Sequence, residues 1–534
     1  MPEIDGDHAL AWGAVEAGVS LVTGYPGSPG TGVFNTLSET AKVYGHKTEW
    51  CTNEKVALDV AAGAVQGGRR VLVCIKSVGM NVASDTLMTL NMTGAPGLVV
   101  MIGDDPGAWG SQNEQDSRLQ GPLAEVPILE PATPDEGRRM IRFAFDLSEE
   151  VGTLVIVRVT RGFTQRVEDL AEIEAPAERP ARPIDREPMR WISTSINTVE
   201  NDRRRHRALE IAEEEFGDLP FNEISGSGTR GVLTGGFAHT KFLDAVSGAD
   251  LSEICWLKLG ALYPLPKDII AQFLKGCDKV LVLEEVSPYL EDAIKSIGYD
   301  AGATPKVLGK RTGHVNWEGE LFRWHIQETL GSYLPGFSPD RRYSEAEWEK
   351  EKPERKNPCA GCPFEQILGM FREEAEALGQ NPFIAADPGC VVAGRRYLDA
   401  KHSMGSAISV AAGVTRAGFE QKVVAAFGDS AFYHSGVNAL MQARVTETDL
   451  LMLLFDNGGS HTTGGQQTPD RGLLRDGRRG PTIGIHDIAS AFGVSSIWTV
   501  EDEDPEEKMR SVFREALTRE GLGLVVLRKP CKRD

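Results

Sequence analysis

The chain has 534 residues, of which 41% are hydrophobic and 25% charged, and its formal net charge is −20. This length is too great for one hydrophobic core and indicates roughly three or four domains, while the negative charge argues against nucleic acid and anionic membranes as partners. No apolar run approaches the roughly 20 residues that span a bilayer, and the start of the chain is acidic, so we expect a cytoplasmic protein.

Residues 1–175 repeat a rhythm of short apolar runs and helical patterns. The runs lie at residues 19–23, 71–75, 98–102 and 154–159. This alternation predicts an open parallel α/β domain, and such sheets bind ligands where the carboxyl ends of their strands meet the loops.

Two motifs of this domain stand at such positions. Tyr25, Pro26, Gly27 and Ser28 follow the first run, where they form either a rigid turn or a ligand-binding loop. Glu54 opens the next helical pattern, where a carboxylate is by itself only a favourable partner of the helix dipole.

The middle of the chain predicts a second, smaller domain between two connecting segments. Prolines at 176, 180, 183 and 188 indicate a linker over 176–228, in which the charged helical segment 203–215 is expected to be a solvated connector. Residues 229–310 form the smaller α/β domain, with strands at 232–234, 255–259 and 280–283. A second linker covers 311–356, and the last domain covers 357–534.

The last domain carries the strongest signal, between residues 423 and 469. A buried run at 423–427 ends in Gly428, Asp429 and Ser430 and gives way to a helix, whose N-terminus can bind an anion. A second apolar run, at 450–455, is followed by Asn457 and Gly459. If the two strands are parallel, their carboxyl ends lie at the same sheet edge, and so do these residues. Carboxylate, amide and carbonyl oxygens are the ligands that Mg²⁺ prefers, so the stretch predicts a metal-bound diphosphate.

Eight cysteines are too few for a disulfide scaffold in a chain of this length. Cys359 and Cys362 form a Cys-x-x-Cys pair, which alone is compatible with zinc, with redox chemistry or with no function. Cys390 and Cys531 lie in the same domain. The remaining four are expected to be buried apolar residues: Cys51, Cys74, Cys255 and Cys277.

The separation of 28 residues between Asp429 and Asn457 resembles the thiamine-diphosphate motif, and Thr463 and Gly464 narrow the resemblance to the 2-oxoacid:ferredoxin oxidoreductases. The chain closely resembles the α subunits of indolepyruvate ferredoxin oxidoreductases in residues 76–81, 103–107 and 111–118. The resemblance implies two thiamine-diphosphate-binding domains, one for the pyrimidine and one for the diphosphate. It also implies a transketolase C-terminal-like domain between them.

The resemblance also implies roles for individual residues. Glu54 activates the cofactor by protonating the pyrimidine ring. Ser28 stands where the family has a hydroxyl residue that contacts the substrate carboxylate. Asp429, Asn457 and Gly459 hold Mg²⁺, while Cys359, Cys362, Cys390 and Cys531 ligate one [4Fe–4S] cluster. The other expected cofactor-binding residues are Tyr25, Pro26, Gly27, Asn81, Gly428, Ser430, Thr463 and Gly464.

The implied activity is the oxidative decarboxylation of an aryl or branched 2-oxoacid to an acyl-CoA, with CoA as co-substrate. Electrons would pass to ferredoxin or another acceptor, and a separate smaller subunit would complete a dimer of heterodimers. The chain stops three residues after Cys531, where the family's two-cluster ferredoxin domain would follow, so we expect a separate acceptor protein.

At four positions the chain differs from the family pattern. These differences weaken the expectation of an aryl substrate more than the expectation of thiamine and iron–sulfur chemistry. The four residues are Ser77, Lys401, His402 and His461. Two alternatives stay open: a non-redox decarboxylase or carboligase on the same scaffold, and a non-catalytic paralogue that binds the cofactor. The four cysteines of the last domain argue against the first alternative, and Glu54 argues against the second.

Overall fold

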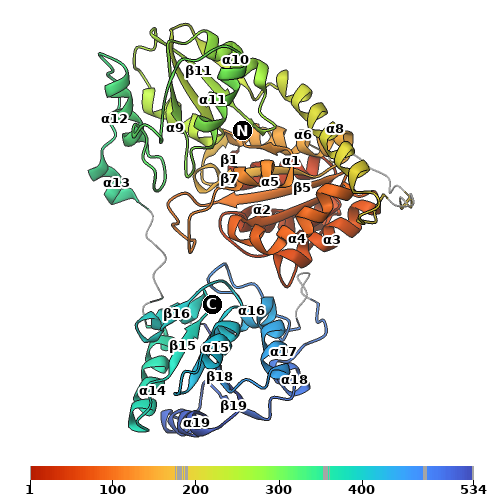
Figure 1. The fold of residues 1–534 in the computed structure, drawn as a ribbon, viewed down its shortest axis with the longest axis vertical. Coiled ribbons are helices and arrows are strands. Elements are labelled where there is room, and N and C mark those ends of the chain that lie inside the picture. The colour runs from red at the N-terminus through yellow and green to blue at the C-terminus, as the bar shows by residue number, and fades with distance from the viewer. Residues whose placement is uncertain are drawn as a thin grey trace. The chain divides into compact units, whose positions relative to one another are not determined.

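The structure is a computed structural model that describes residues 2–174, 176, 183–184, 186, 190–352, 359, 361–472 and 478–531. The chain divides into two compact units, Met1–Arg355 and Lys356–Asp534 (Figure 1). Each unit is described by itself.

The first unit contains a seven-stranded sheet in the order β12-β6-β7-β5-β4-β2-β3. All residues of β4, β5 and β7 are buried, since helices cover both faces, and this burial explains their continuous apolar runs. The four predicted strands are confirmed to within two residues. The strands are β2 (Leu21–Gly24), β3 (Lys47–Trp50), β4 (Val71–Lys76), β5 (Leu98–Asp104), β6 (Ile128–Leu129), β7 (Val155–Thr160) and β12 (Ala261–Tyr263).

Seven helices and a two-stranded ribbon accompany this sheet. The ribbon pairs β1 (Glu3–Asp5) with β8 (Val167–Asp169) in antiparallel fashion. The helices are α1 (Gly6–Glu16), α2 (Thr31–Tyr44), α3 (Glu54–Gln66), α4 (Ser77–Thr93), α5 (Gln120–Ala124), α6 (Pro134–Val151) and α7 (Arg161–Thr164), and a short 3₁₀ turn, η1 (Ser117–Leu119), precedes α5.

A five-stranded sheet forms the smaller mid-chain domain of the same unit, in the order β14-β13-β10-β11-β9. Its strands are β9 (Glu223–Gly226), β10 (Arg230–Gly235), β11 (Ile254–Leu259), β13 (Lys279–Leu283) and β14 (Lys306–Leu308). Its helices are α9 (Phe237–Val246), α10 (Lys267–Lys275), α11 (Tyr289–Asp300) and α12 (Arg323–Tyr333). The three predicted strands of this domain are confirmed. Strand β12, which follows β11, leaves this domain and pairs with β6, so the two sheets belong to one unit.

The structure corrects the expectation that 176–228 and 311–356 are only connecting chain. Helix α8 (Thr198–Gly217) buries Ala208, Ala212 and Phe216 in the core of the first domain. These residues are four positions apart and form one apolar stripe. Most of the other residues of the helix are polar or charged, so the sequence pattern indicates a solvated helix. The second range contains α12, whose Ile326 and Leu330 pack into the core of the mid-chain domain, and α13 (Glu345–Glu351).

The second unit is built on an entirely parallel six-stranded sheet in the order β16-β15-β17-β18-β20-β19. Its strands are β15 (Phe383–Ala386), β16 (Ala400–Lys401), β17 (Val423–Gly428), β18 (Leu450–Asp456), β19 (Ser496–Val500) and β20 (Leu522–Arg528). Two apolar cores cover its faces. The parallel pairing of β17 with β18 confirms the prediction that their carboxyl ends meet, since Gly428 lies opposite Phe455.

The helices of the second unit include a π-helical turn directly after β17. They are α14 (Pro363–Ala377), η2 (Cys390–Tyr397), α15 (Ala407–Arg416), α16 (Asp429–Ala431), the π-helix η3 (Phe432–Gly436), α17 (Val437–Val445), α18 (Ile485–Ala491) and α19 (Glu506–Thr518). Across the part of the chain that the structure describes, no helix combines the length and the apolar character needed to cross a bilayer.

Candidate functional site

Four neighbouring parallel strands of the second unit end at the same sheet edge, and a polar residue or a cysteine follows each of them. Asp387 follows β15, Asp429 follows β17, Asn457 follows β18 and Cys531 follows β20. The carboxyl edge of a parallel sheet is where such folds bind ligands. This edge is therefore the first candidate site.

Asp429 is buried at this edge, with 2% of its surface exposed. Its carboxylate accepts hydrogen bonds from the backbone N–H groups of Ser430 (2.7 Å) and Gly458 (3.2 Å). Burial, together with the nearby charge of Asp456, raises the pKa of Asp429 to about 7. A bound cation would offset both effects, so the position suits a metal ligand.

Asp456 differs from Asp429 because its charge is already paired. Its carboxylate forms an ion pair with Arg471 and lies 3.6 Å from the guanidinium of Arg528. Both carboxylates accept the N–H of Gly458 at 3.2 Å, but the ion pair with Arg471 belongs to Asp456.

Asn457 joins the end of β18 to the loop that follows and to the end of the chain. Its carbonyl accepts a hydrogen bond from the backbone N–H of Cys531 (3.3 Å) and lies 2.9 Å from Nε2 of His461. Gly458 and Gly459 have φ of 94° and 155°, values that favour glycine. A side chain at Gly459 would also crowd the carbonyl of Gln466, so the turn needs glycine there.

The loop beyond Gly459 folds back on itself. Ser460 pairs with Gln466 in an antiparallel bridge, and Oγ1 of Thr463 donates to Oε1 of Gln466 at 2.7 Å. Gly464 has φ of 119° inside this turn. Thr463 and Gly464 are thereby held in the same loop as Asn457 and Gly459.

The first unit places Glu54 at its own carboxyl sheet edge. Asn53 caps α3 by accepting the N–H of Val56 at 2.9 Å, so Glu54 is the first helical residue, and only 7% of its surface is exposed. Gly79 faces the Glu54 carboxyl group, and any side chain at 79 would overlap it. The start of α4 thus leaves a space that the carboxyl group of Glu54 fills.

The loops after β2 and β5 reach the same edge. Gly27 lies against the side chain of Lys76, at the end of β4, and Ser28 beside it is exposed. Nζ of Lys76 donates to the carbonyl of Gly110 at 3.1 Å, and Nδ2 of Asn81 donates to Oε1 of Gln115 at 3.2 Å. The structure therefore gathers the loop 25–28, Glu54 and Asn81 at one edge, together with the loop 105–118.

The four cysteines of the second unit lie in one region. The N–H of Cys362 donates to the carbonyl of Cys359 at 3.0 Å, and α14, which begins after Cys362, packs on η2, which begins at Cys390. Burial raises the pKa of Cys390 to about 11, and the charges of Cys362, Cys531 and Cys359 act in the same direction. As their side chains lie, no three His, Cys, Asp or Glu residues of the described ranges converge closely enough to hold a metal ion.

Three further polar residues lie at these edges, to which the sequence motifs assign no role of their own. Lys76 is buried and its amino group binds the loop after β5. Asp387 accepts the N–H of Ala407 at 2.9 Å, and burial raises its pKa to about 6. Its place directly after a buried strand was a usable signal. His434 lies buried in the π-helix η3, and no sequence pattern predicts such a turn.

Two models of known protein families match parts of this chain. The family model described as "Pyruvate flavodoxin/ferredoxin oxidoreductase, thiamine diP-bdg" matches residues 12–208, and the one described as "Thiamine pyrophosphate enzyme, C-terminal TPP binding domain" matches residues 377–527. A solved 2-oxoglutarate:ferredoxin oxidoreductase from Magnetococcus marinus shares the fold over 62% of this chain and 65% of its own, with a TM-score of 0.51 and 14% identity. The fold is thus that of a thiamine-dependent 2-oxoacid oxidoreductase, and the chain is an enzyme of that class.

Similarity over the whole chain gives the family. Indolepyruvate oxidoreductase subunit IorA of Thermococcus kodakarensis is 31% identical over 98% of this chain and 85% of its own length. The IorA of Methanothermobacter marburgensis is 32% identical over 98% of this chain and 86% of its own length. The chain belongs to the IorA family of the 2-oxoacid:ferredoxin oxidoreductases.

Proposed function

We propose that the chain binds thiamine diphosphate with Mg²⁺ and one [4Fe–4S] cluster, and oxidatively decarboxylates an aryl or branched 2-oxoacid to an acyl-CoA. The observation that carries this proposal is the carboxyl edge of the second unit. There the buried Asp429 lies beside the start of a helix, and the carbonyl of Asn457 accepts the N–H of Cys531 (3.3 Å). When bound, the thiamine would supply the carbon nucleophile that attacks the keto group and the electron sink that lets carbon dioxide leave.

The residues of the second unit fit a metal-bound diphosphate. Asp429 and Asn457, with a carbonyl near Gly459, would supply oxygen ligands to Mg²⁺. The backbone around Gly428 and Ser430, and the folded loop with Thr463 and Gly464, would hold the diphosphate oxygens.

The residues of the first unit fit the reactive end of the cofactor and the substrate. Glu54 would hold the proton of the pyrimidine ring, in a position where burial keeps water away from it. Tyr25, Pro26, Gly27 and Asn81 would line the cofactor. The exposed hydroxyl group of Ser28 would meet the carboxylate of the 2-oxoacid.

The cluster would be held by Cys359, Cys362, Cys390 and Cys531, because four thiolates are what one [4Fe–4S] cluster requires. The hydrogen bond from the N–H of Cys531 to the carbonyl of Asn457 (3.3 Å) connects this region to the expected magnesium ligands. When bound, the cluster would supply one-electron redox chemistry in the same unit as the expected diphosphate site.

The substrates and partners follow from the relatives. The IorA relatives are named for indolepyruvate, and their designation as a subunit supports a separate smaller subunit here, in a dimer of heterodimers. The solved 2-oxoglutarate enzyme binds coenzyme A, which supports CoA as the acyl acceptor. Ser77, Lys401, His402 and His461 are the positions that would set the choice of 2-oxoacid.

The electron acceptor would meet an open groove of about 690 Å³ on the second unit. Cys359 and Cys362 lie in its wall, and so do three arginines, Arg395, Arg396 and Arg510. A cluster held by these cysteines would be reached from this groove, and the arginines suit an acidic protein such as a ferredoxin.

The deciding experiment uses the complex purified anaerobically with its smaller subunit. Absorbance and electron paramagnetic resonance spectra are recorded before and after indolepyruvate or a branched 2-oxoacid is added with CoA. We expect an iron–sulfur spectrum that is reduced by substrate only when thiamine diphosphate is present, with acyl-CoA as the product. Aldehyde without reduction of a cluster would instead indicate the non-redox decarboxylase.

A further inference from the structure

The loop 105–118 leaves β5 at the sheet edge beside Glu54 and reaches the residues around it. It contacts Lys76 through Gly110 and Asn81 through Gln115. It has no regular secondary structure before η1 begins at Ser117. Its shape must therefore come from side-chain contacts, and the structure shows where these come from.

The base of the loop is closed from the first domain. Asp104, at the end of β5, accepts hydrogen bonds from both the N–H (2.9 Å) and the hydroxyl of Ser117. Asp105 accepts the N–H of Gly110 at 2.8 Å and the hydroxyl of Ser111. These contacts fix the two ends of the loop close together, but not the direction in which it extends.

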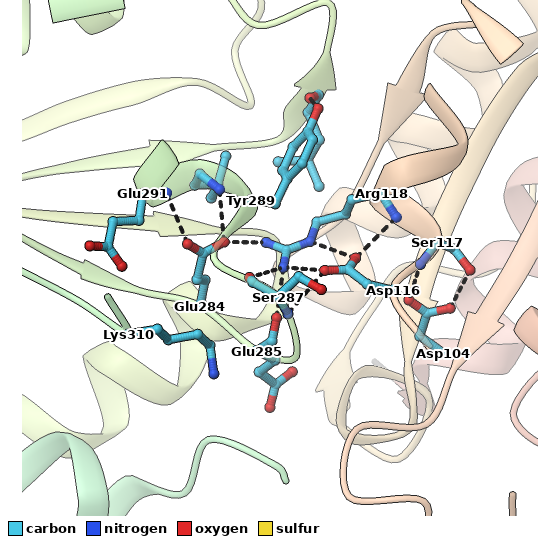
Figure 2. A network of polar contacts seen from close by, with 12 residues as sticks. Asp104, Asp116, Ser117, Arg118, Glu284, Glu285, Ser287, Tyr289, Glu291 and Lys310 are labelled. Carbon is cyan, nitrogen blue, oxygen red and sulfur yellow. Dashed lines mark hydrogen bonds and ion pairs between the residues drawn. The ribbon is translucent and has the colours of Figure 1, made fainter. Parts of the chain in front are cut away.

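Arg118 ties the C-terminal end of the loop to the mid-chain domain (Figure 2). Its guanidinium binds the carboxylate of Asp116 (2.7 and 2.9 Å) and the carboxylate of Glu284 (2.8 Å), which follows β13. It also donates to the carbonyls of Glu285 (2.6 Å) and Ser287 (3.0 Å). Only 4% of the Arg118 side chain is exposed, so its charge is satisfied inside the protein.

A second connection ties the middle of the loop to the same domain. Nε1 of Trp109 donates to Glu320 at 3.0 Å. The other oxygen of Glu320 binds Nζ of Lys241 at 2.7 Å, and the same amino group binds Glu285 at 2.6 Å. Glu114 adds a bond to the N–H of Gly319 at 3.3 Å.

A buried network of this kind adds little to stability compared with apolar packing of the same volume, because both charges must leave water. The network instead fixes the relative positions of the segments that it joins, because the planar guanidinium group fits only one arrangement of its acceptors. The network spans two sheets and converges on a loop that reaches the site. We propose that Arg118 is a positioning residue: with Lys241 and Glu320 it holds the loop 105–118 in the shape that the 2-oxoacid site requires. This inference rests on the proposed function.

The test compares Arg118→Lys with Arg138→Lys. Arg138 is a matched control because its guanidinium also binds a buried carboxylate, Glu16, and two backbone carbonyls, those of Ala171 and Glu172, but it lies on α6. Lysine keeps the charge and loses the fork in both variants. Both are made in the complex with the smaller subunit.

Two readouts are taken. In the cofactor-free protein, hydrogen exchange of the segment 105–116 should speed up at least ten-fold in Arg118→Lys and stay unchanged in Arg138→Lys. In the active complex, the KM for the 2-oxoacid should rise at least ten-fold in Arg118→Lys only, while the Kd for thiamine diphosphate stays within two-fold. Glu320→Gln leaves Arg118 intact and should also increase the hydrogen-exchange rate of 105–116 and the KM for the 2-oxoacid. This variant tests the proposal if Arg118→Lys does not fold.

The proposal is overturned if folded Arg118→Lys or Glu320→Gln leaves both the exchange of 105–116 and the KM unchanged, or if Arg138→Lys raises the KM as much. The failure of the proposed function looks different. In that case no 2-oxoacid is turned over by the unmodified complex, whereas the exchange of the loop still responds to Arg118→Lys.

Discussion

At the scale of single residues, Glu54 carries the most specific chemical expectation. If its carboxyl group only stabilises the N-terminus of α3, Glu54→Gln should cost roughly 0.3–1 kcal/mol of stability and nothing else. If it serves the pyrimidine ring, Glu54→Gln should keep the fold and the cofactor affinity. Hydrogen–deuterium exchange at the thiazolium carbon should then slow by about 10²-fold or more, as followed by quenched-flow NMR.

A matched control is available in α6. Glu136 also lies in the first turn of a helix and is equally buried, with 7% of its surface exposed, but it pairs with Lys258. Glu136→Gln should lower stability and leave the exchange rate as in the wild type. A Glu54→Gln protein that exchanges as fast as the wild type would favour the non-catalytic paralogue.

Asp429 and Asp456 are 27 residues apart in sequence and differ in their partners, which predicts different effects on the cofactor. Asp429→Ala should abolish Mg²⁺-dependent binding of thiamine diphosphate, because the dication and the diphosphate lose a carboxylate that nothing else replaces. Asp456→Ala should be milder, since the charge of Asp456 is already paired with Arg471. Titration calorimetry measures both, and equal affinities for the wild type and Asp429→Ala would refute the assignment.

Asp7 provides a prediction about pH that is independent of any cofactor. Its Oδ1 is shielded from solvent and has no hydrogen-bond partner among the described residues. Burial, then the charge of Asp5, raises the pKa of Asp7 to about 7. The folded protein therefore holds a proton that the unfolded chain releases near pH 4, and stability falls as the pH rises from about 4 to 7.

Asp7→Asn removes this effect. The variant should match the wild type near pH 4 and be more stable at pH 8, by on the order of 2 kcal/mol once partial exposure is allowed for. Thermal unfolding at the two pH values measures the difference. Asp135→Asn, at an exposed carboxylate paired with Arg139, should show no such trend. A constant difference between Asp7→Asn and the wild type would contradict the assignment.

At the scale of elements, the sequence predicts best where burial is complete. Strands β17 and β18 are continuous apolar runs, so both strands, and the meeting of Asp429 and Asn457 at one edge, followed from the pattern. The sequence does not predict the burial of helix α8, because its apolar stripe is narrow and lies among many charges. The pairing of β12 with β6 joins residues more than 130 apart, and the turn η3 depends on local packing, so neither leaves a pattern in the sequence.

The elements around the four cysteines of the second unit predict an iron content. Cys362 precedes α14, Cys390 begins η2 and Cys531 follows β20, so three separate segments supply the thiols. We expect about four irons per chain in protein purified anaerobically, and their loss in Cys362→Ser. Cys255→Ser, at a buried thiol of β11, should keep the iron. About one zinc per chain in place of iron would rule out the cluster.

At the scale of the whole molecule, the net charge of −20 makes the position of three arginines in one groove informative. An acidic protein is repelled by most of such a surface, so its approach should be guided to the place where positive charge gathers. Two glutamates also line the groove, and each pairs with one of the arginines, Glu365 with Arg396 and Glu373 with Arg510, so the lining keeps a net charge of about one positive unit. Arg395 adds a further positive charge beside Cys359 and Cys362 in the wall of the groove.

This charge pattern predicts that Arg395→Glu and Arg396→Glu, made together, raise the KM for a ferredoxin roughly ten-fold at low salt, with a smaller effect at high salt because exposed charges are screened. The rate with a small viologen dye should not change, since the dye needs no docking surface. Arg203→Glu, at a side chain that is 74% exposed on α8, changes the net charge by the same amount per residue and should leave the KM unaltered. An equal loss of rate with the dye would show that the arginines support the cluster itself, and an unchanged KM for ferredoxin would place the docking surface elsewhere.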